Sequence, residues 1–90
     1  MTDNVLRYYW QPQSGVEPRE IVTLFYRSDL PDTPRAVAYQ LILDSGKIDF
    51  HAHVVKSPDL PKIEIYADSY KKLQNKCERI VIRFDREQSQ

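Results

Sequence analysis

The sharpest chemical pattern in this sequence is a short run that carries one carboxylate and two imidazoles. Asp49, His51 and His53 occupy alternate positions, so on a β-strand they project from one face, about 6–7 Å apart. Zn²⁺ accepts such ligands, and Glu64 on a neighbouring strand is a candidate fourth. The simpler interpretation is the solvated face of a strand. We therefore predict no metal or other cofactor, and a small metal-dependent enzyme built on this motif is the third functional hypothesis.

The second pattern is a basic cluster near the C-terminus. Its members are Tyr70, Lys71, Lys72, Lys76, Arg79 and Arg83. A cluster of cations such as this one is able to contact a phosphate backbone, and a neighbouring tyrosine is able to stack on a base. The whole chain, however, has 13 basic and 13 acidic residues, whereas a nucleic-acid-binding domain is usually strongly basic. Nucleic-acid binding is therefore the second hypothesis, and lysines late in a helix also favour its macrodipole without any function.

Aromatic side chains support the first hypothesis. The chain has six tyrosines and one tryptophan, and protein interfaces favour both residue types. The predicted partner-binding residues are Tyr8, Trp10, Tyr26 and Tyr66, although aromatic rings also cap a small core with their polar groups at its rim. We expect a non-enzymatic protein–protein interaction module that acts through an aromatic-rich sheet face or edge and forms a homodimer. An accessory, regulatory or inhibitor protein of phage or microbial type fits this size.

Signs of covalent catalysis are weak in this sequence. Cys77 is the only cysteine and closes an apolar helical stripe with no histidine near it in sequence, which is typical of a buried structural thiol. Two glycines hardly suffice for a phosphate-binding loop, and the acids are scattered in loops rather than paired. We therefore assign no catalytic residue and expect that the protein is not an enzyme.

Cysteine usage and hydropathy predict a location. A single cysteine precludes an intramolecular disulfide, and a small domain with a free thiol is typical of a reducing compartment. Residues 1–4 are polar rather than of the signal-peptide type, and no apolar run approaches the roughly 18 residues that span a bilayer. The expected location is the cytoplasm of a cell or of an infected host, with no membrane partner.

The elements that must position these residues follow mainly from period-two patterns. The predicted strands are, in chain order, residues 5–10, 20–27, 48–55, 62–67 and 78–85. The second and last of these have apolar residues on both faces, which favours central positions in a sheet. A short helix over residues 70–77 carries the apolar stripe of Tyr70, Leu73 and Cys77 at spacings of three and four.

Residues 35–44 allow two interpretations. As a helix, the segment has Thr33 as its N-cap, Pro34 in its first turn and Gly46 just past its end. As a strand, it places Val37, Tyr39 and other apolar residues on one face, and residues 44–47 form a hairpin turn with Gly46 at a positive φ. We favour the strand because the polar residues do not separate cleanly on a helical wheel.

The two interpretations lead to two architectures for what the 90 residues predict to be a single domain, 1–90. The favoured α+β fold is a curled, mostly antiparallel sheet of about six strands with one short C-terminal helix over 70–77. The alternative is a ferredoxin-like β-α-β-β-α-β order with an extra N-terminal strand. In both, residues 86–90 are expected to fray as a tail.

Overall fold

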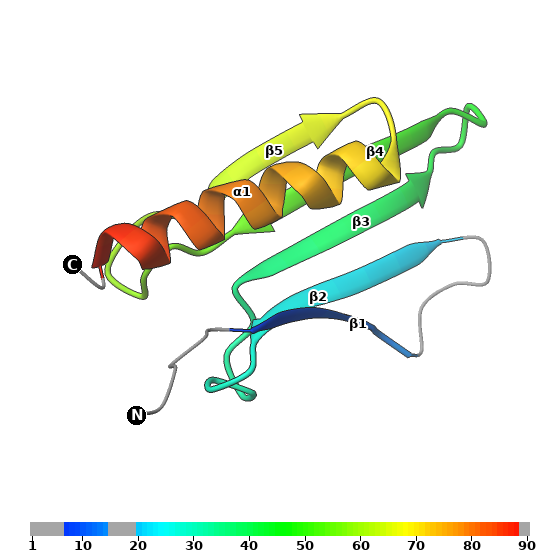
Figure 1. Cartoon of the computed structure of the whole chain (residues 1–90). Coiled ribbons are helices and arrows are strands. Elements are labelled where there is room, and N and C mark those ends of the chain that lie inside the picture. Colours follow the sequence, from blue (N-terminus) through cyan, green and yellow to red (C-terminus); the bar gives the residue numbers. More distant parts are fainter. Residues whose placement is uncertain (1–6, 15–19, 89–90) are drawn as a thin grey trace.

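Five antiparallel strands and one C-terminal helix make up the fold (Figure 1). The computed structural model describes residues 7–14 and 20–88. In chain order the elements are β1 Tyr8–Pro12, β2 Ile21–Arg27, β3 Ala36–Ile42, β4 Ile48–Val54, β5 Ile63–Ala67 and α1 Tyr70–Gln88. The predicted α+β class, with an antiparallel sheet and a C-terminal helix, is confirmed.

The sheet is a meander in which every strand pairs with its neighbour in sequence, in the order β1-β2-β3-β4-β5. Between β3 and β4 the chain reverses in a tight turn. Leu43 N donates to Lys47 O and Gly46 N donates to Leu43 O, with an N···O distance of 2.8 Å in each hydrogen bond. Gly46 has φ 87°. A glycine adopts this left-handed conformation at little steric cost. The strand interpretation of residues 35–44 and the predicted turn are therefore confirmed.

One face of the sheet packs against α1, and we call it the covered face. Its buried centre consists of Phe25, Ala36, Ala38, Ala52, Val54 and Ile65. The register places Phe25 opposite Ala36 on the next strand. The three alanines have small side chains, which let the helix backbone lie close to the middle of the sheet.

Helix α1 covers this face with an apolar stripe that recurs at every fourth position. Leu73, Cys77 and Val81 are all 0% exposed, and α1 packs across β3, β4 and β5. The helix begins where the Oγ of Ser69 accepts a hydrogen bond from Lys72 N, as an N-cap does. No helix of the described residues is long and apolar enough to cross a membrane.

The prediction of a last strand over residues 78–85 is wrong, because this segment is helical, and the helix predicted over residues 70–77 is longer than expected. α1 continues through this segment to Gln88, so the sheet formed by the described residues has five strands rather than the expected six. Ile80, Val81 and Ile82 favour a strand locally. The buried stripe nevertheless continues to Val81 with the helical period, and the chain has no glycine or proline after Pro61 to end the helix. Tertiary burial therefore outweighs local β-propensity.

The two ends of the chain depart less from the prediction. The first strand was predicted at residues 5–10, whereas β1 is Tyr8–Pro12 and residues 5 and 6 lie outside the described part. Of the expected tail, residues 86–88 form the end of α1, and residues 89 and 90 lie outside the described part.

Candidate functional site

The face of the sheet that points away from α1 is not covered by any described element, and we call it the open face (Figure 1). Successive side chains of a strand point to opposite faces, so the residues that alternate with the covered ones lie here. They are Tyr9, Gln11, Val22, Leu24, Tyr26, Val37, Tyr39, Leu41, Asp49, His51, His53, Glu64 and Tyr66.

Polarity changes across the open face from strand to strand. Strands β2 and β3, two of the three interior strands, contribute only Val, Leu and Tyr, most of them half-buried. The polar residues of this face lie on β4 and β5, apart from Gln11, which lies on the opposite edge strand β1. The strand residues of this face include two carboxylates, Asp49 and Glu64, and no lysine or arginine. The face thus has an apolar centre with a polar, slightly acidic margin.

Stacked rings form a row across three strands of the open face. The register places His51 opposite Tyr39 on one side and Tyr66 on the other. The His51 ring stacks on Tyr39 with centroids 5.7 Å apart and on Tyr66 with centroids 4.9 Å apart. Although Tyr66 is 57% exposed, its ring and that of Tyr39 hold the imidazole of His51 from both sides.

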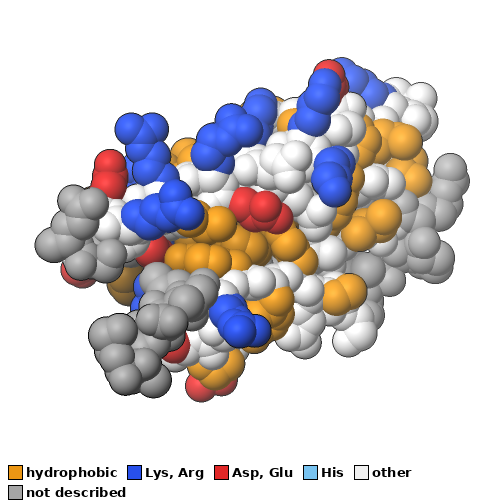
Figure 2. Space-filling model, viewed as in Figure 1, with side chains coloured by type: hydrophobic (Ala, Val, Ile, Leu, Met, Phe, Trp, Pro, Cys, Tyr) orange, Lys and Arg blue, Asp and Glu red, His pale blue; other side chains and the backbone are white. Residues whose placement is uncertain are grey.

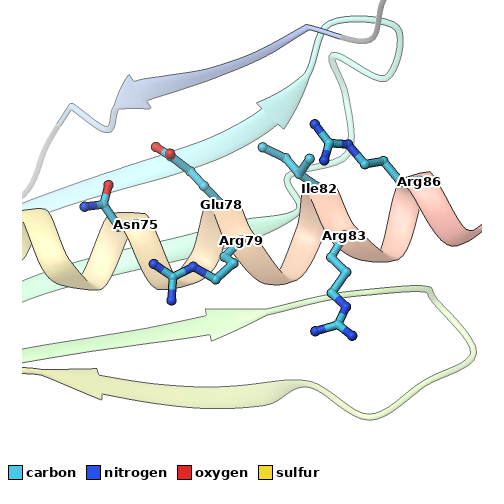
Figure 3. A pocket seen from close by; sticks show the side chains of 6 residues that line it. All are labelled: Asn75, Glu78, Arg79, Ile82, Arg83 and Arg86. Carbon is cyan, nitrogen blue, oxygen red and sulfur yellow. The ribbon is translucent and has the colours of Figure 1, made fainter.

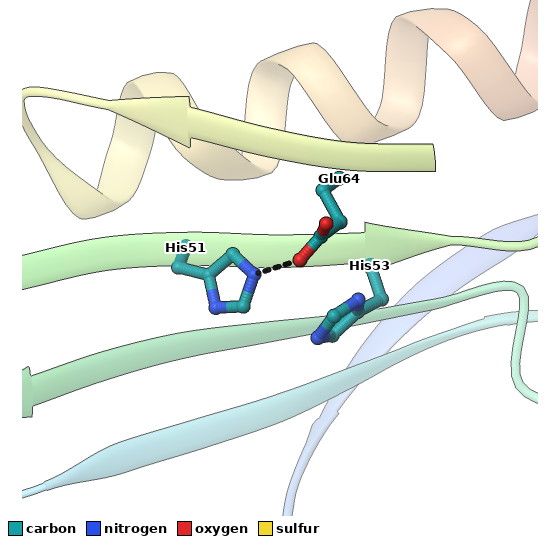
Figure 4. Close-up of side chains that lie close together, drawn as sticks. All are labelled: His51, His53 and Glu64. Atoms are coloured by element: carbon teal, nitrogen blue, oxygen red, sulfur yellow. Dashed lines mark hydrogen bonds and ion pairs between the residues drawn. The ribbon is translucent and has the colours of Figure 1, made fainter. Parts of the chain in front are cut away.

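The two histidines meet a carboxylate beside this row (Figure 4). The ligand atoms of His51, His53 and Glu64 all lie within 4.8 Å of one another, and Nε2 of His51 is 3.3 Å from Oε1 of Glu64. The structure thus brings together both predicted histidines and the predicted fourth candidate, Glu64. Asp49, which was expected to complete the group, is on the same strand but is not part of it.

The four predicted partner-binding residues divide between the two faces. Tyr26 and Tyr66 lie on the open face. Tyr8 and Trp10 lie on the covered face, where they pack against the core. The Tyr8 hydroxyl donates to Oδ2 of Asp85 and Trp10 Nε1 donates to Oε2 of Glu78, with a donor–acceptor distance of 2.7 Å in each hydrogen bond. The structure therefore does not bring Tyr8 and Trp10 together with Tyr26 and Tyr66.

A buried ion pair anchors the C-terminal half of α1 to the sheet. Arg35 donates two hydrogen bonds of 2.9 Å, one to each carboxylate oxygen of Asp85. Burial acts to raise the pKa of Asp85, but the hydrogen bonds from Arg35 and Tyr8 outweigh it and lower that pKa below its ordinary value. For Tyr8, burial and then Asp85 raise the pKa to about 12. Sequence reasoning missed this pair because it placed Asp85 on a strand.

The predicted basic residues share one helix, and most share one side of it. Lys72, Lys76, Arg79 and Arg83, with Arg86 one step further, recur at spacings of four and three, and all are exposed. We call these five residues the basic stripe. Figure 2 shows Lys and Arg side chains gathered on the helix side of the molecule.

Beside the basic stripe lies a shallow depression of about 510 Å³, lined by Asn75, Glu78, Arg79, Ile82, Arg83 and Arg86 (Figure 3). Arg79 and Arg83 point to one side of α1, whereas Glu78, Ile82 and Arg86, the last member of the stripe, point to the other. Tyr70 does not belong to this surface. Its hydroxyl donates a hydrogen bond of 3.1 Å to Ala38 O on the covered face. Lys71 is exposed but lies off the stripe.

Cys77 is a buried structural thiol, as predicted. Its side chain is 0% exposed in the centre of the core. Burial, with a smaller contribution from the charge of Glu78, raises the pKa of the thiol to about 12. A thiol in this state is a poor nucleophile, because only the thiolate reacts.

Comparison with protein-family models, with curated proteins and with solved structures finds no significant match to this chain.

Proposed function

We propose that this chain is a non-enzymatic interaction module that forms a symmetric homodimer through its open face. The observation that carries the proposal is the apolar centre of that face, formed by β2 and β3 on the side that α1 leaves uncovered. A contiguous apolar surface with a polar margin is typical of a protein–protein interface.

The size of the open face suits a small dimer. Five strands spaced about 4.8 Å apart and about six residues long give roughly 24 × 20 Å, or about 500 Å² of flat area. Two such faces in contact bury on the order of 1,000 Å², which is the lower end of specific interfaces. Self-association is therefore expected to be reversible and to depend on concentration.

The distribution of polarity favours a two-fold arrangement centred on β2 and β3. A two-fold interface brings each patch against its own copy. An axis near the cross-strand pair Leu24 and Val37 packs apolar residues of one chain on those of the other. It leaves Asp49 and Glu64 at the rim, where they keep contact with water and do not oppose each other at close range.

Sedimentation velocity over a range of protein concentrations tests the proposal. The wild type is expected to shift from the 10.6 kDa chain mass towards twice that mass. Leu24→Lys places a charge at the centre of the face and is expected to remain monomeric. Asn75→Lys adds the same charge at an exposed position of α1 and is expected to dimerise like the wild type.

Two results would contradict the homodimer. One is a wild-type chain that stays monomeric at millimolar concentration. The other is a dimer that Asn75→Lys disrupts and Leu24→Lys does not, because that pattern moves the interface to the helix side.

Nucleic-acid binding is a second candidate function, and the basic stripe is the observation that favours it. The five cations, Lys72 to Arg86, span 15 helical residues, and the 14 rises between them correspond to about 21 Å of helix. Such a row can follow a phosphate backbone. Part of its charge is already compensated, since Lys72 pairs with Asp68 at 3.1 Å and Arg83 with Glu87 at 3.7 Å.

A gel-shift titration at several salt concentrations tests this second function. Retardation of a labelled duplex or single strand is expected to weaken steeply with salt, and the charge reversals Lys76→Glu and Arg83→Glu should abolish it. Lys47→Glu, in the β3–β4 turn, is the matched control. Absence of retardation at low salt would exclude the function, whereas equal loss in the control would show that binding does not depend on the stripe.

A further inference from the structure

We infer that His51, His53 and Glu64 form a binding site for a divalent transition-metal cation of the zinc class. All three ligands come from one chain, so the site does not depend on the proposed homodimer. It stands on the polar margin of the open face, formed by β4 and β5.

The β4–β5 ladder fixes where the three ligands start. His53 and Glu64 are direct cross-strand partners, and such pairs have Cβ atoms about 4.5–5.5 Å apart. His51 is two residues away on the same strand and therefore on the same face. Its imidazole is held between the rings of Tyr39 and Tyr66, which limits the conformational freedom that metal binding would remove.

The distances suit one small cation. Two ligands about 2.0–2.2 Å from a tetrahedral Zn²⁺ lie about 3.3–3.6 Å from each other. Nε2 of His51 and Oε1 of Glu64 are already 3.3 Å apart, and the remaining ligand atoms lie within 4.8 Å. Glu64 has a side chain 59% exposed, so rotation about its side-chain bonds can close the remaining gap.

The ligand types select the metal. Imidazole nitrogens suit zinc, cobalt, nickel and copper, whereas Mg²⁺ and Ca²⁺ prefer six or more oxygen ligands. Three protein ligands leave one tetrahedral position for water or another small ligand.

The local charge also favours a cation. The strand residues of the open face include no lysine or arginine. Asp49 lies on the same face, two residues before His51, and adds negative potential without belonging to the cluster. This makes Asp49 a matched control for Glu64, because both are carboxylates on one face and only Glu64 is predicted to bind the metal.

Isothermal titration of the purified, chelator-treated protein with ZnCl₂ tests the site. One ion per chain is expected, with the same affinity at two protein concentrations that differ tenfold. His53→Ala and Glu64→Gln should each weaken binding by at least about tenfold, as loss of one of three ligands implies. Asp49→Asn should change the affinity by less than about threefold, since it removes only distant charge. Circular dichroism verifies that each variant remains folded.

NMR supplies a second readout that does not depend on the variants. Zn²⁺ should shift the imidazole signals of both histidines together, whereas MgCl₂ at the same concentration should leave them in place. The inference is overturned if the folded wild type shows no saturable zinc binding. It is overturned equally if only one histidine responds, if Asp49→Asn weakens binding as much as Glu64→Gln, or if the affinity rises with protein concentration, which would place the site between chains.

Discussion

The two faces of this sheet differ although they are made by the same strands. On β3, Ala36 and Ala38 point towards α1 and are at most 1% exposed, while the intervening Val37 and the following Tyr39 point to the open face and are half-buried. On β3 the covered side thus has small residues beneath a helix, and the open side has large residues that no described element covers. Alternation along a strand therefore separates the residues that stabilise the fold from those that are displayed.

The polar groups of the two faces differ in the same way. On the covered side, Arg35 and Asp85 satisfy each other in a buried, bidentate pair, and Tyr8 donates to the same carboxylate. No buried side-chain polar atom of the described residues lacks a partner. On the open side, His51 and Glu64 form one long contact of 3.3 Å that leaves most of their hydrogen-bonding capacity free for a ligand.

The largest predicted effect comes from breaking the buried ion pair. Asp85→Ala leaves the Arg35 guanidinium, whose side chain is only 7% exposed, with the backbone carbonyls of Val55 and Lys56 but without an anionic partner. Loss of one partner of a buried pair costs about 3–5 kcal/mol, so the free energy of unfolding in urea should fall by that amount. Asp32→Ala, in an exposed turn, is the control and should have little effect. A loss below 1 kcal/mol for Asp85→Ala would mean that the helix is held to the sheet without this pair.

A matched pair of leucine truncations compares the faces directly. Leu73 is 0% exposed under the helix, so Leu73→Ala should cost about 2–5 kcal/mol through lost burial and a cavity. Leu24→Ala, on the half-buried centre of the open face, should cost about 1 kcal/mol or less. Urea denaturation should be measured at concentrations too low for self-association, since dimerisation would add to the apparent stability. Equal costs would contradict the distinction between the faces.

How far the sequence predicts this fold depends on the kind of pattern in each segment. Strict alternation located β4 and β5 almost to the residue, and Gly46 located the hairpin turn. The same rule failed over residues 78–85, where Ile80, Ile82 and Phe84 recur at every second position as in a strand but lie on α1. An eight-residue segment can fit both the helical and the strand period of apolar residues. Which of the two forms depends on packing against the sheet, which the segment alone does not reveal.

The candidate site was likewise predictable from the sequence only in part. Alternation alone placed His51 and His53 on one face, because that rule needs no tertiary information. Choosing Glu64 over Asp49 as the third member required the β4–β5 register, which depends on pairing. Tyr8 and Trp10 were assigned to a partner because aromatic composition cannot reveal which side a helix will cover.

Alkaline pH should loosen the covered side through Tyr8. Its pKa is raised to about 12 in the folded chain, by burial and by Asp85, against about 10 when unfolded. The protonated phenol therefore contributes stability that is fully present below pH 10 and is lost as the pH rises towards 12. Tyr8→Phe should lower stability at neutral pH by about 1.5–3 kcal/mol, because it deletes a hydrogen bond to a charged acceptor.

The pH series supplies its own control for that prediction. Urea denaturation at pH 8, 10 and 11.5 should show a decline in the wild type that is smaller in Tyr8→Phe. Tyr66→Phe, on the open face, should decline like the wild type. An identical decline in all three proteins would assign the alkaline sensitivity to other groups.

The smallest predicted effect on stability is on the open face, at Tyr66. This ring is 57% exposed and stacks on His51 with centroids 4.9 Å apart. Tyr66→Ala should therefore cost about 0.5–1 kcal/mol, the size of one aromatic contact, while Tyr66→Phe keeps the ring and should leave stability unchanged. In sedimentation, Tyr66→Ala should weaken the dimer, and Tyr66→Phe should not. A loss of stability above 2 kcal/mol would show that the ring is needed to fold the chain, and the open face would then be a second structural surface rather than one that is free to bind.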